Sequence, residues 1–246
     1  MTVIDRARSV IALAVEEFGS SLAILTSFQR EGVVIIDLVM AVAPHIPVMT
    51  IDTGRLPAAT LDMIAAVESR YGISVERIVP DSMEVEAMVA SYGPDLFYDG
   101  VARRSLCCNV RKVRPLARRL ATVAAYLTGI RRTQSETRSD IDVVDRSGST
   151  VKISPLADWS PDDVMRYTRD RALPESALYA AGYTSIGCDP CTRAVRAGED
   201  ERAGRWWWEN GADKECGLHF SPDGRVERTV DVLLREVLLR AEGSKI

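Results

Sequence analysis

The five cysteines of the sequence fall into three groups whose spacing suits metal binding or thiol chemistry. Cys107 and Cys108 are adjacent, Cys188 and Cys191 form a C-x-x-C pair, and Cys216 stands alone. An odd number of cysteines argues against a disulfide framework, and four thiolates in two pairs can bind zinc or an iron–sulfur cluster. Zinc ribbons use two C-x-x-C turns, which an adjacent pair fits poorly. A cluster, a structural zinc site and unrelated buried cysteines are the three interpretations that the residues leave open.

The lone cysteine has polar surroundings, Lys214-Glu215-Cys216-Gly217-Leu218-His219. Such a context favours an accessible thiol over an inert buried one. Nearby cations lower the pKa of a thiol and raise the fraction of thiolate, which is the nucleophilic form. Cys216 is therefore a candidate nucleophile.

Basic residues gather around both cysteine pairs. Residues 103–119 hold seven basic side chains and no acid: Arg103, Arg104, Arg111, Lys112, Arg114, Arg118 and Arg119. A second set follows the C-x-x-C pair: Arg193, Arg196, Arg202 and Arg205, and then Trp206, Trp207 and Trp208. Arginine suits bidentate binding of phosphate or sulfate, and cations stabilise metal-bound thiolates. A solvated helix face or an RNA-binding surface would also explain the first run.

Composition narrows the class of protein. The 246 residues are 46% hydrophobic and 27% charged, which is ordinary globular composition and excludes a wholly disordered, collagen-like or coiled-coil chain. A net charge of −4 gives no reason to expect nucleic acid or an anionic membrane as a partner. The longest apolar stretch, residues 38–49, is broken by prolines and too short to span a bilayer, and no signal peptide is recognisable. We therefore expect a cytoplasmic protein.

Alternating patterns predict the elements that must position these residues. We expect strands at residues 22–26, 47–51, 75–79 and 124–130, and a hairpin formed by residues 143–145 and 151–153. We expect helices at residues 4–18, 31–43, 57–71, 83–92 and 230–241, and one that begins with Ser160-Pro161-Asp162-Asp163. Strands that alternate with helices predict an α/β fold with a parallel sheet flanked by helices.

Ligands of such sheets bind beyond the carboxyl ends of the strands, so the loops that follow strands are the informative ones. The turn Thr26-Ser27-Phe28-Gln29 leads from a strand into a helix and can cradle an anion. By itself that signal is weak.

Beyond about residue 184 the regular pattern fades, so we expect a nucleotide-binding α/β domain over residues 1–184, with the first cysteine pair, and a C-terminal segment over residues 185–246. The irregular C-terminal segment carries the second pair, Cys216 and a terminal helix.

Four segments together resemble the assimilatory phosphosulfate reductases, specifically the iron–sulfur type that acts on adenosine 5′-phosphosulfate. They are Cys107-Cys108-Asn-Val-Arg-Lys112, residues 128–138 with the sequence TGIRRTQSETR, residues 186–193 with IGCDPCTR, and residues 201–219. The turn Ile51-Asp-Thr-Gly54 also fits, and the segments come in the family's order. Five cysteines in these contexts make the resemblance specific.

The resemblance implies an adenine nucleotide α-hydrolase-like (PP-loop-like) three-layer fold and a role for each candidate residue. A 4Fe–4S cluster would be held by Cys107, Cys108, Cys188 and Cys191. Cys216 would be the nucleophile, with Lys112 and His219 as further catalytic residues. Arg138, Arg202 and Arg205 would contact the phosphosulfate group. The residues toward the nucleotide would be Thr26, Ser27, Gln29, Ile51, Thr53 and Gly129.

By the same resemblance, the chain would be an adenylyl-sulfate reductase of sulfate assimilation and cysteine biosynthesis. It would reduce adenosine 5′-phosphosulfate to sulfite and AMP through an S-sulfocysteine, with thioredoxin or a similar dithiol as donor. Three alternatives remain: a reductase of the 3′-phosphorylated substrate, a tRNA-thiolating enzyme of the same fold, and a zinc-stapled nucleotide-binding module. Reductases of the 3′-phosphorylated substrate commonly lack the four cysteines. The first loop lacks the Ser-Gly-Gly-x-Asp-Ser pattern, which disfavours ATP cleavage. The apolar face of the terminal helix packs on its own domain or joins subunits of a homo-oligomer.

Overall fold

A computed structural model describes residues 2–134, 138–209 and 225–243, with the side chains of residues 225–228 left out of the description. The chain divides into two compact units. The first comprises Met1–Ile51, Ala58–Arg77 and Arg118–Tyr179, and the second comprises Asp52–Pro57, Ile78–Ala117 and Ala180–Ile246. Each unit is therefore assembled from three separate stretches of chain, and both cysteine pairs belong to the second. The predicted division near residue 184 stays a prediction.

A six-stranded sheet organises the first unit, in the order β3-β2-β1-β4-β6-β5. The strands are β1 (Leu22–Leu25), β2 (Val48–Ile51), β3 (Glu76–Ile78), β4 (Ala125–Leu127), β5 (Val144–Asp145) and β6 (Val151–Ile153). β1 runs parallel to β2 and β4, β4 runs parallel to β6, and β5 pairs antiparallel with β6. The alternating strand and helix pattern therefore predicts the sheet correctly, and the expected hairpin of residues 143–153 is confirmed.

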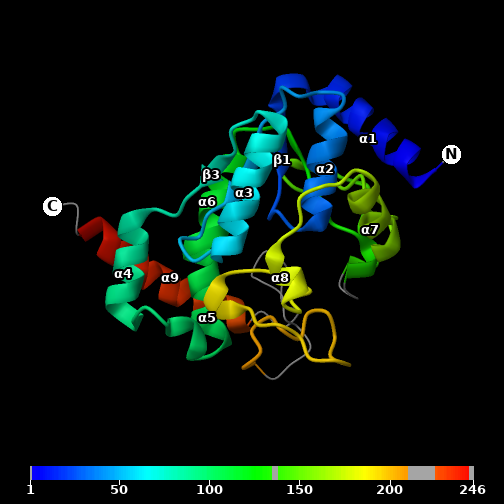
Figure 1. The fold of residues 1–246 in the computed structure, drawn as a ribbon. Helices are drawn as coiled ribbons and strands as arrows, with labels where there is room; N and C mark the ends of the chain where they lie inside the picture. The colour runs from blue at the N-terminus through cyan, green and yellow to red at the C-terminus, as the bar shows by residue number, and fades with distance from the viewer. Residues whose placement is uncertain (1, 135–137, 210–224, 244–246) are drawn as a thin grey trace. The chain divides into compact units, whose positions relative to one another are not determined.

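Helices cover the sheet in the first unit (Figure 1): α1 (Val3–Phe18), α2 (Arg30–Met40), α3 (Ala58–Tyr71) and α7 (Pro161–Asp170). The predicted start of α7 is confirmed, because Ser160 and Asp163 form a capping box and Pro161 occupies the first turn. α2 is buried continuously from Gly32 to Val39, so it is the central helix of this unit.

The one acid in the buried part of α2 is satisfied by three side chains. Asp37, which is 4% exposed, accepts hydrogen bonds from the hydroxyls of Tyr71 and Tyr167, each at 2.8 Å, and from Nε of Arg171 at 3.1 Å. Tyr71 lies in α3 and Tyr167 in α7. Asp37 therefore ties the carboxyl-terminal half of α2 to both neighbouring helices.

Helices form the frame of the second unit: α4 (Ser82–Tyr92), α5 (Val101–Cys108), a π-helical turn (Asn109–Val113), the beginning of α6 (Arg114–Leu120) and α9 (Arg225–Gly243). α9 packs against α4 and α5 (Figure 1) and buries Val237 and Ala241 there. The structure thus gives the apolar face of the terminal helix a partner within its own unit. A short helix, α8 (Ala177–Ala180), ends the first unit's last stretch.

No helix among the residues that the structure describes is both long and apolar enough to cross a lipid bilayer.

Candidate active site

Predicted nucleotide-contacting residues of the first unit follow three adjacent parallel strands. Thr26, Ser27 and Gln29 lie between β1 and α2, Ile51 ends β2, and Gly129 follows β4. The chain leaves β1 toward β2 on one side and returns to β4 on the other, so the sheet changes winding direction between β1 and β4. A parallel sheet opens a crevice at such a switch point, beyond the carboxyl ends of the strands. The structure thus brings these residues to the edge where ligands bind.

The turn between β1 and α2 is held in a strained form. Phe28 is a buried residue with a φ of 56°, a value that non-glycine residues adopt only when their surroundings enforce it. Its backbone N–H donates to Oγ1 of Thr26 at 3.0 Å, and a Cβ on Gly32 would lie 2.0 Å from that same oxygen. Thr26 is therefore a structural support of the turn, while Ser27 is exposed beside the amino-terminal end of α2. That end favours an anion.

Gly129 permits the loop after β4 to approach α2 closely. A Cβ at this position would lie 2.8 Å from the carbonyl carbon and the Cβ of Glu31, and 2.9 Å from its carbonyl oxygen. Residues that follow in the same loop form a series of polar contacts. Arg131 binds the Glu31 carboxylate, Gln134 donates to the same carboxylate, and Arg138 donates to Gln134. The structure thus connects the predicted substrate residue Arg138 to the first turn of α2.

In the second unit, all four cysteines of the two pairs lie in one apolar cluster with Trp206 and side chains of α4, α5 and α9. Cys107 and Cys108 end α5, and the π-helical turn follows at once. Such turns frequently occur at functional sites. Cys188 immediately precedes the 3₁₀ turn Asp189–Cys191 and Cys191 ends it; the hydroxyl of Thr192 donates to the Cys188 carbonyl at 2.9 Å. None of the four forms a disulfide.

The four thiols are close enough to influence one another's ionisation. Burial raises the pKa of Cys191 to about 12, with added contributions from Cys188, Cys108 and Cys107, while Arg205 opposes the rise. Burial likewise raises the pKa of Cys107, and the Arg111 guanidinium opposes it. Four thiolates in so small a space need compensating positive charge, either from neighbouring cations or from a bound metal.

Guanidinium groups supply part of that charge. Arg111 hydrogen-bonds Cys107 and also donates to the Thr53 carbonyl at 2.9 Å. Arg104, 3% exposed, hydrogen-bonds Cys108 and forms a 2.7 Å ion pair with Glu209. Arg205, 7% exposed, lies on the side of Cys191, where a Cβ on Gly187 would come within 2.3 Å of its guanidinium.

Trp206 is the aromatic centre of this arrangement. The centroid of its ring lies 4.5 Å from the guanidinium carbon of Arg104 and 4.6 Å from that of Arg205, distances at which a cation and an aromatic face attract. Trp206 is 1% exposed whereas Trp207 is 48% exposed. The three tryptophans therefore point in different directions, as expected for consecutive residues.

Thr53 lies against the cysteines. Its hydroxyl is 3.3 Å from Sγ of Cys188 and accepts a hydrogen bond from the backbone N–H of Arg55 at 3.2 Å, and the residue is 1% exposed. Thr53 is predicted to face the nucleotide, but the structure gives its side chain a contact with a predicted cluster ligand. Hydrogen bonds to ligand sulfurs tune the properties of a metal centre.

The remaining predicted residues divide into two groups. Lys112 lies half-buried in the π-helical turn, four residues after Cys108, and Arg202 lies half-buried in the turn that precedes Arg205. Cys216 and His219 lie outside the described residues, so their predicted roles stay predictions.

Three second-unit residues have no individual role predicted from the sequence: Arg55, whose charge acts on Cys107, and the ion pair of Arg104 and Glu209 beside Cys108. Arg104 belongs to the basic run, but nothing in that run distinguishes its buried side chain from exposed neighbours. Arg55 directly follows the Asp-Thr-Gly turn, which is the one local signal that could have pointed to it. Glu209 has no signal in the sequence, because its partner Arg104 lies far away along the chain.

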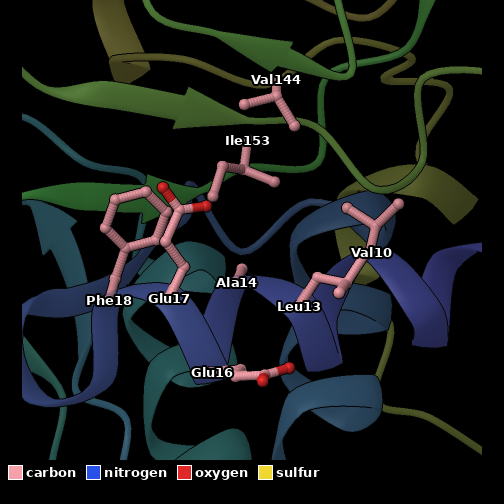
Figure 2. A pocket seen from close by; sticks show the side chains of 8 residues that line it. All are labelled: Val10, Leu13, Ala14, Glu16, Glu17, Phe18, Val144 and Ile153. Atoms are coloured by element: carbon pink, nitrogen blue, oxygen red, sulfur yellow. The ribbon is translucent and has the colours of Figure 1, made fainter.

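A surface hollow of about 470 Å³ opens elsewhere in the first unit (Figure 2). α1 contributes most of its lining and the hairpin strands contribute Val144 and Ile153. None of the predicted site residues lines it, so it has no part in the candidate active site.

The four cysteines of the two pairs can be compared with what a zinc ion and an iron–sulfur cluster each require of their ligands. Around one tetrahedral zinc, with Zn–S bonds near 2.3 Å, four sulfurs would lie about 3.8 Å apart. In the described part of the chain, no three His, Cys, Asp or Glu side chains come together in a way that could hold a single metal ion. A four-iron cluster has a different requirement, because each iron takes one cysteine. Four reduced cysteines in two pairs, with cations beside them, fit that donor set.

Comparison with known proteins identifies the class. Residues 21–194 match the phosphoadenosine phosphosulfate reductase domain family, and the chain belongs to this family. It is thus a reductase that acts on a sulfur group, as predicted.

Individual relatives and solved structures resemble the chain to different degrees. The chain is 46% identical over 207 residues to the adenosine 5′-phosphosulfate reductase of Allochromatium vinosum, an alignment that covers 82% of this chain and 81% of the relative. Among solved structures, a phosphoadenylyl-sulfate reductase from Candida auris in complex with phosphate is 28% identical with a TM-score of 0.63, covering 77% of this chain and 90% of that one. Yeast FAD synthetase is 13% identical with a TM-score of 0.53, covering 78% of this chain and 66% of that one. This last likeness is one of fold, and the predicted fold class is confirmed.

Proposed function

We propose that this chain reduces adenosine 5′-phosphosulfate to sulfite and AMP, with Cys216 as nucleophile and a thioredoxin-like dithiol as electron donor. Membership of the reductase family and 46% identity to a protein named for this substrate support the proposal. The observation that carries it is the gathering of Cys107, Cys108, Cys188 and Cys191 in one buried group bordered by arginines. We place the activity in sulfate assimilation and cysteine biosynthesis, in the cytoplasm.

The same four cysteines would hold a 4Fe–4S cluster. When bound, such a cluster would fix the two cysteine pairs relative to each other and balance their negative charge. Arg104, Arg111 and Thr53 would then act on the cluster through the cysteine sulfurs that they contact.

The first chemical step is a transfer of the sulfuryl group to Cys216. The thiolate attacks the sulfur atom, an S–S bond forms, the S–O bond to the phosphate breaks, and AMP leaves with the electron pair. A thiolate and a substrate anion about 4 Å apart repel by roughly 4 kcal/mol at an effective dielectric constant near 20. Uncompensated, that repulsion would slow the step about a thousandfold. Lys112, Arg138, Arg202 and Arg205 are proposed to supply the compensation, and His219 is proposed to assist.

The second step returns the enzyme to its starting state. A donor thiolate attacks the sulfur of Cys216, and sulfite leaves with the electrons of the S–S bond. The donor's second thiol then attacks the mixed disulfide and restores the Cys216 thiolate. Two electrons pass from the dithiol to the sulfuryl sulfur, and the donor ends as a disulfide.

The test is anaerobic purification of the chain, analysis of iron and labile sulfide, and measurement of sulfite release with a reduced thioredoxin. We expect four irons and four sulfides per chain and sulfite release from adenosine 5′-phosphosulfate. Preference for the 3′-phosphorylated nucleotide would instead support that alternative, toward which the Candida auris likeness points. Zinc in place of iron, or thiolated tRNA as the product, would contradict the proposal.

Cys216→Ser tests the nucleophile. Because a serine hydroxyl is far less nucleophilic than a thiolate, the variant should bind the nucleotide but form no sulfonated protein by intact-mass spectrometry. A stable sulfite adduct on this variant would refute the assignment.

Lys112→Ala tests the proposed cation. Removing one charge-assisted contact to an anion should lower kcat/KM by about tenfold or more, with iron content unchanged. Activity equal to that of the parent would count against a role for Lys112.

A further inference from the structure

The side chain of Gln134 is hydrogen-bonded at both ends of its amide. Its nitrogen Nε2 donates to Oε1 of Glu31 at 3.2 Å. Its oxygen Oε1 accepts from Nη1 of Arg138 at 2.7 Å and from the backbone N–H of Arg131 at 3.2 Å. An amide has one end that only donates and one that only accepts, so its orientation decides which neighbours it can bind.

Glu31 determines that orientation. An ionised carboxylate only accepts hydrogen bonds, so the amide must turn its nitrogen toward Glu31 and its oxygen toward Arg138. Were the amide reversed, its NH₂ group would face the Arg138 guanidinium, two donors would meet, and the contact would be lost.

Glu31 is itself held in place. Arg131 donates to Oε1 of Glu31 from Nε at 2.9 Å and from Nη2 at 2.7 Å, and its side chain is 5% exposed. Gly129 packs directly on the Glu31 backbone. Glu31 lies in the first turn of α2, the helix that Asp37 ties to α3 and α7. The carboxylate is therefore a fixed reference point in the first unit.

We propose that Glu31 and Gln134 are positioning residues that set the place of the Arg138 guanidinium, and thereby substrate affinity. The proposal rests on the proposed function, in which Arg138 binds the phosphosulfate group. Neither residue touches the substrate in this scheme. Glu31 acts through the orientation of the Gln134 amide, and Gln134 acts by holding one nitrogen of Arg138 so that the guanidinium keeps a fixed direction toward the ligand.

Substitutions of either residue separate this role from a general structural one. Gln134→Glu places two carboxylates against each other, and Glu31→Leu removes the acceptor that orients the amide. Glutamine at position 31 would not remove it, because all three hydrogen bonds to Glu31 end on Oε1, which an amide oxygen can replace. Each single variant should raise KM for adenosine 5′-phosphosulfate about tenfold or more, the loss expected for a charge-assisted hydrogen bond.

Two further variants keep the proposal testable if the charge changes impair folding. Gln134→Met leaves the Glu31–Arg131 pair intact and should raise KM as Gln134→Glu does. In an Arg138→Ala background, neither Glu31→Leu nor Gln134→Met should cause a further rise in KM. The matched control is Glu76→Gln, which breaks the bidentate pair of Glu76 with Arg119 in the same unit and should leave KM unchanged.

The outcomes are distinct. KM values that rise in the single variants, but do not rise further when Arg138 is already alanine, support the proposal. Single variants with the parent's KM, or an equal effect of Gln134→Met with and without Arg138, would overturn it while the proposed function stands. A parent protein that releases no sulfite overturns the proposed function, and this inference with it.

Discussion

Replacing Gly129 by alanine should push the loop after β4 away from α2. The added methyl group would meet the carbonyl carbon and Cβ of Glu31 at 2.8 Å and its carbonyl oxygen at 2.9 Å. These atoms are backbone or attached directly to it, so no side-chain rotation relieves the overlap. Ordinary carbon contacts begin near 3.5 Å, so the loop has to move by roughly 0.7 Å.

Overpacking of this kind costs about 1–3 kcal/mol. For a chain of this size, each kcal/mol lowers Tm by about 2–4 °C, so Gly129→Ala should unfold about 2–12 °C below the parent. The displaced loop carries Arg131 and Gln134, so KM for adenosine 5′-phosphosulfate should rise as well. The assays are thermal unfolding followed by circular dichroism and steady-state sulfite release.

Gly148→Ala is the matched control in the same unit. The nearest atoms to its added Cβ lie 3.7 and 4.0 Å away, which is ordinary contact, so Tm and KM should stay close to the parent values. A Gly129→Ala variant whose Tm and KM match those of Gly148→Ala would refute the packing argument.

Two more predictions concern hydrogen bonds. Thr53→Val removes the hydroxyl beside Cys188, so iron should be lost faster in air, measured by the decay of visible absorbance, and a decay rate equal to the parent's would contradict this contact's role. Burial acts to raise the pKa of Asp37, but hydrogen bonds from Arg171, Tyr167 and Tyr71 outweigh it and hold the pKa below its ordinary value. A carboxyl group with a lowered pKa stabilises the fold at pH values above its unfolded-state pKa, near 3.9. The stabilisation is lost as the pH falls through its folded-state pKa. Urea unfolding should therefore show Asp37→Asn destabilised most near neutral pH, with the gap to the parent narrowing below about pH 4, and a gap independent of pH would refute the argument.

Much of the first unit could be predicted because its signals are local. The capping box at Ser160 lies within a few residues of the helix that it starts, and the buried strands are short apolar runs between turns. The site loops follow from the same pattern, since a parallel sheet places the loops after its strands at one edge. Element ends were less accurate, and β4 stops at Leu127, earlier than the apolar run suggests.

Side-chain directions in the second unit could not be predicted in this way. Thr53 and Arg104 owe their contacts to Cys188 and Glu209, residues more than a hundred positions away. The basic residues of the segment 103–119 are equally typical of a solvated helix face. Only the fold distinguishes the buried Arg104 from the exposed Arg118. The backbone of Phe28 is a further example, because a phenylalanine in the sequence does not predict a positive φ.

The interleaved make-up of the second unit affects how the protein forms during synthesis. Every residue of the first unit precedes Ala180, whereas the second unit needs α9 to complete its core. At about 5–20 residues per second, a ribosome takes several seconds to pass from Cys108 to Cys191 and longer to reach α9. During that interval the core around the vicinal thiols is incomplete, because Cys191 and the α9 side chains that pack in it have not yet been made. We therefore expect the vicinal thiols to be most reactive before the last helix emerges.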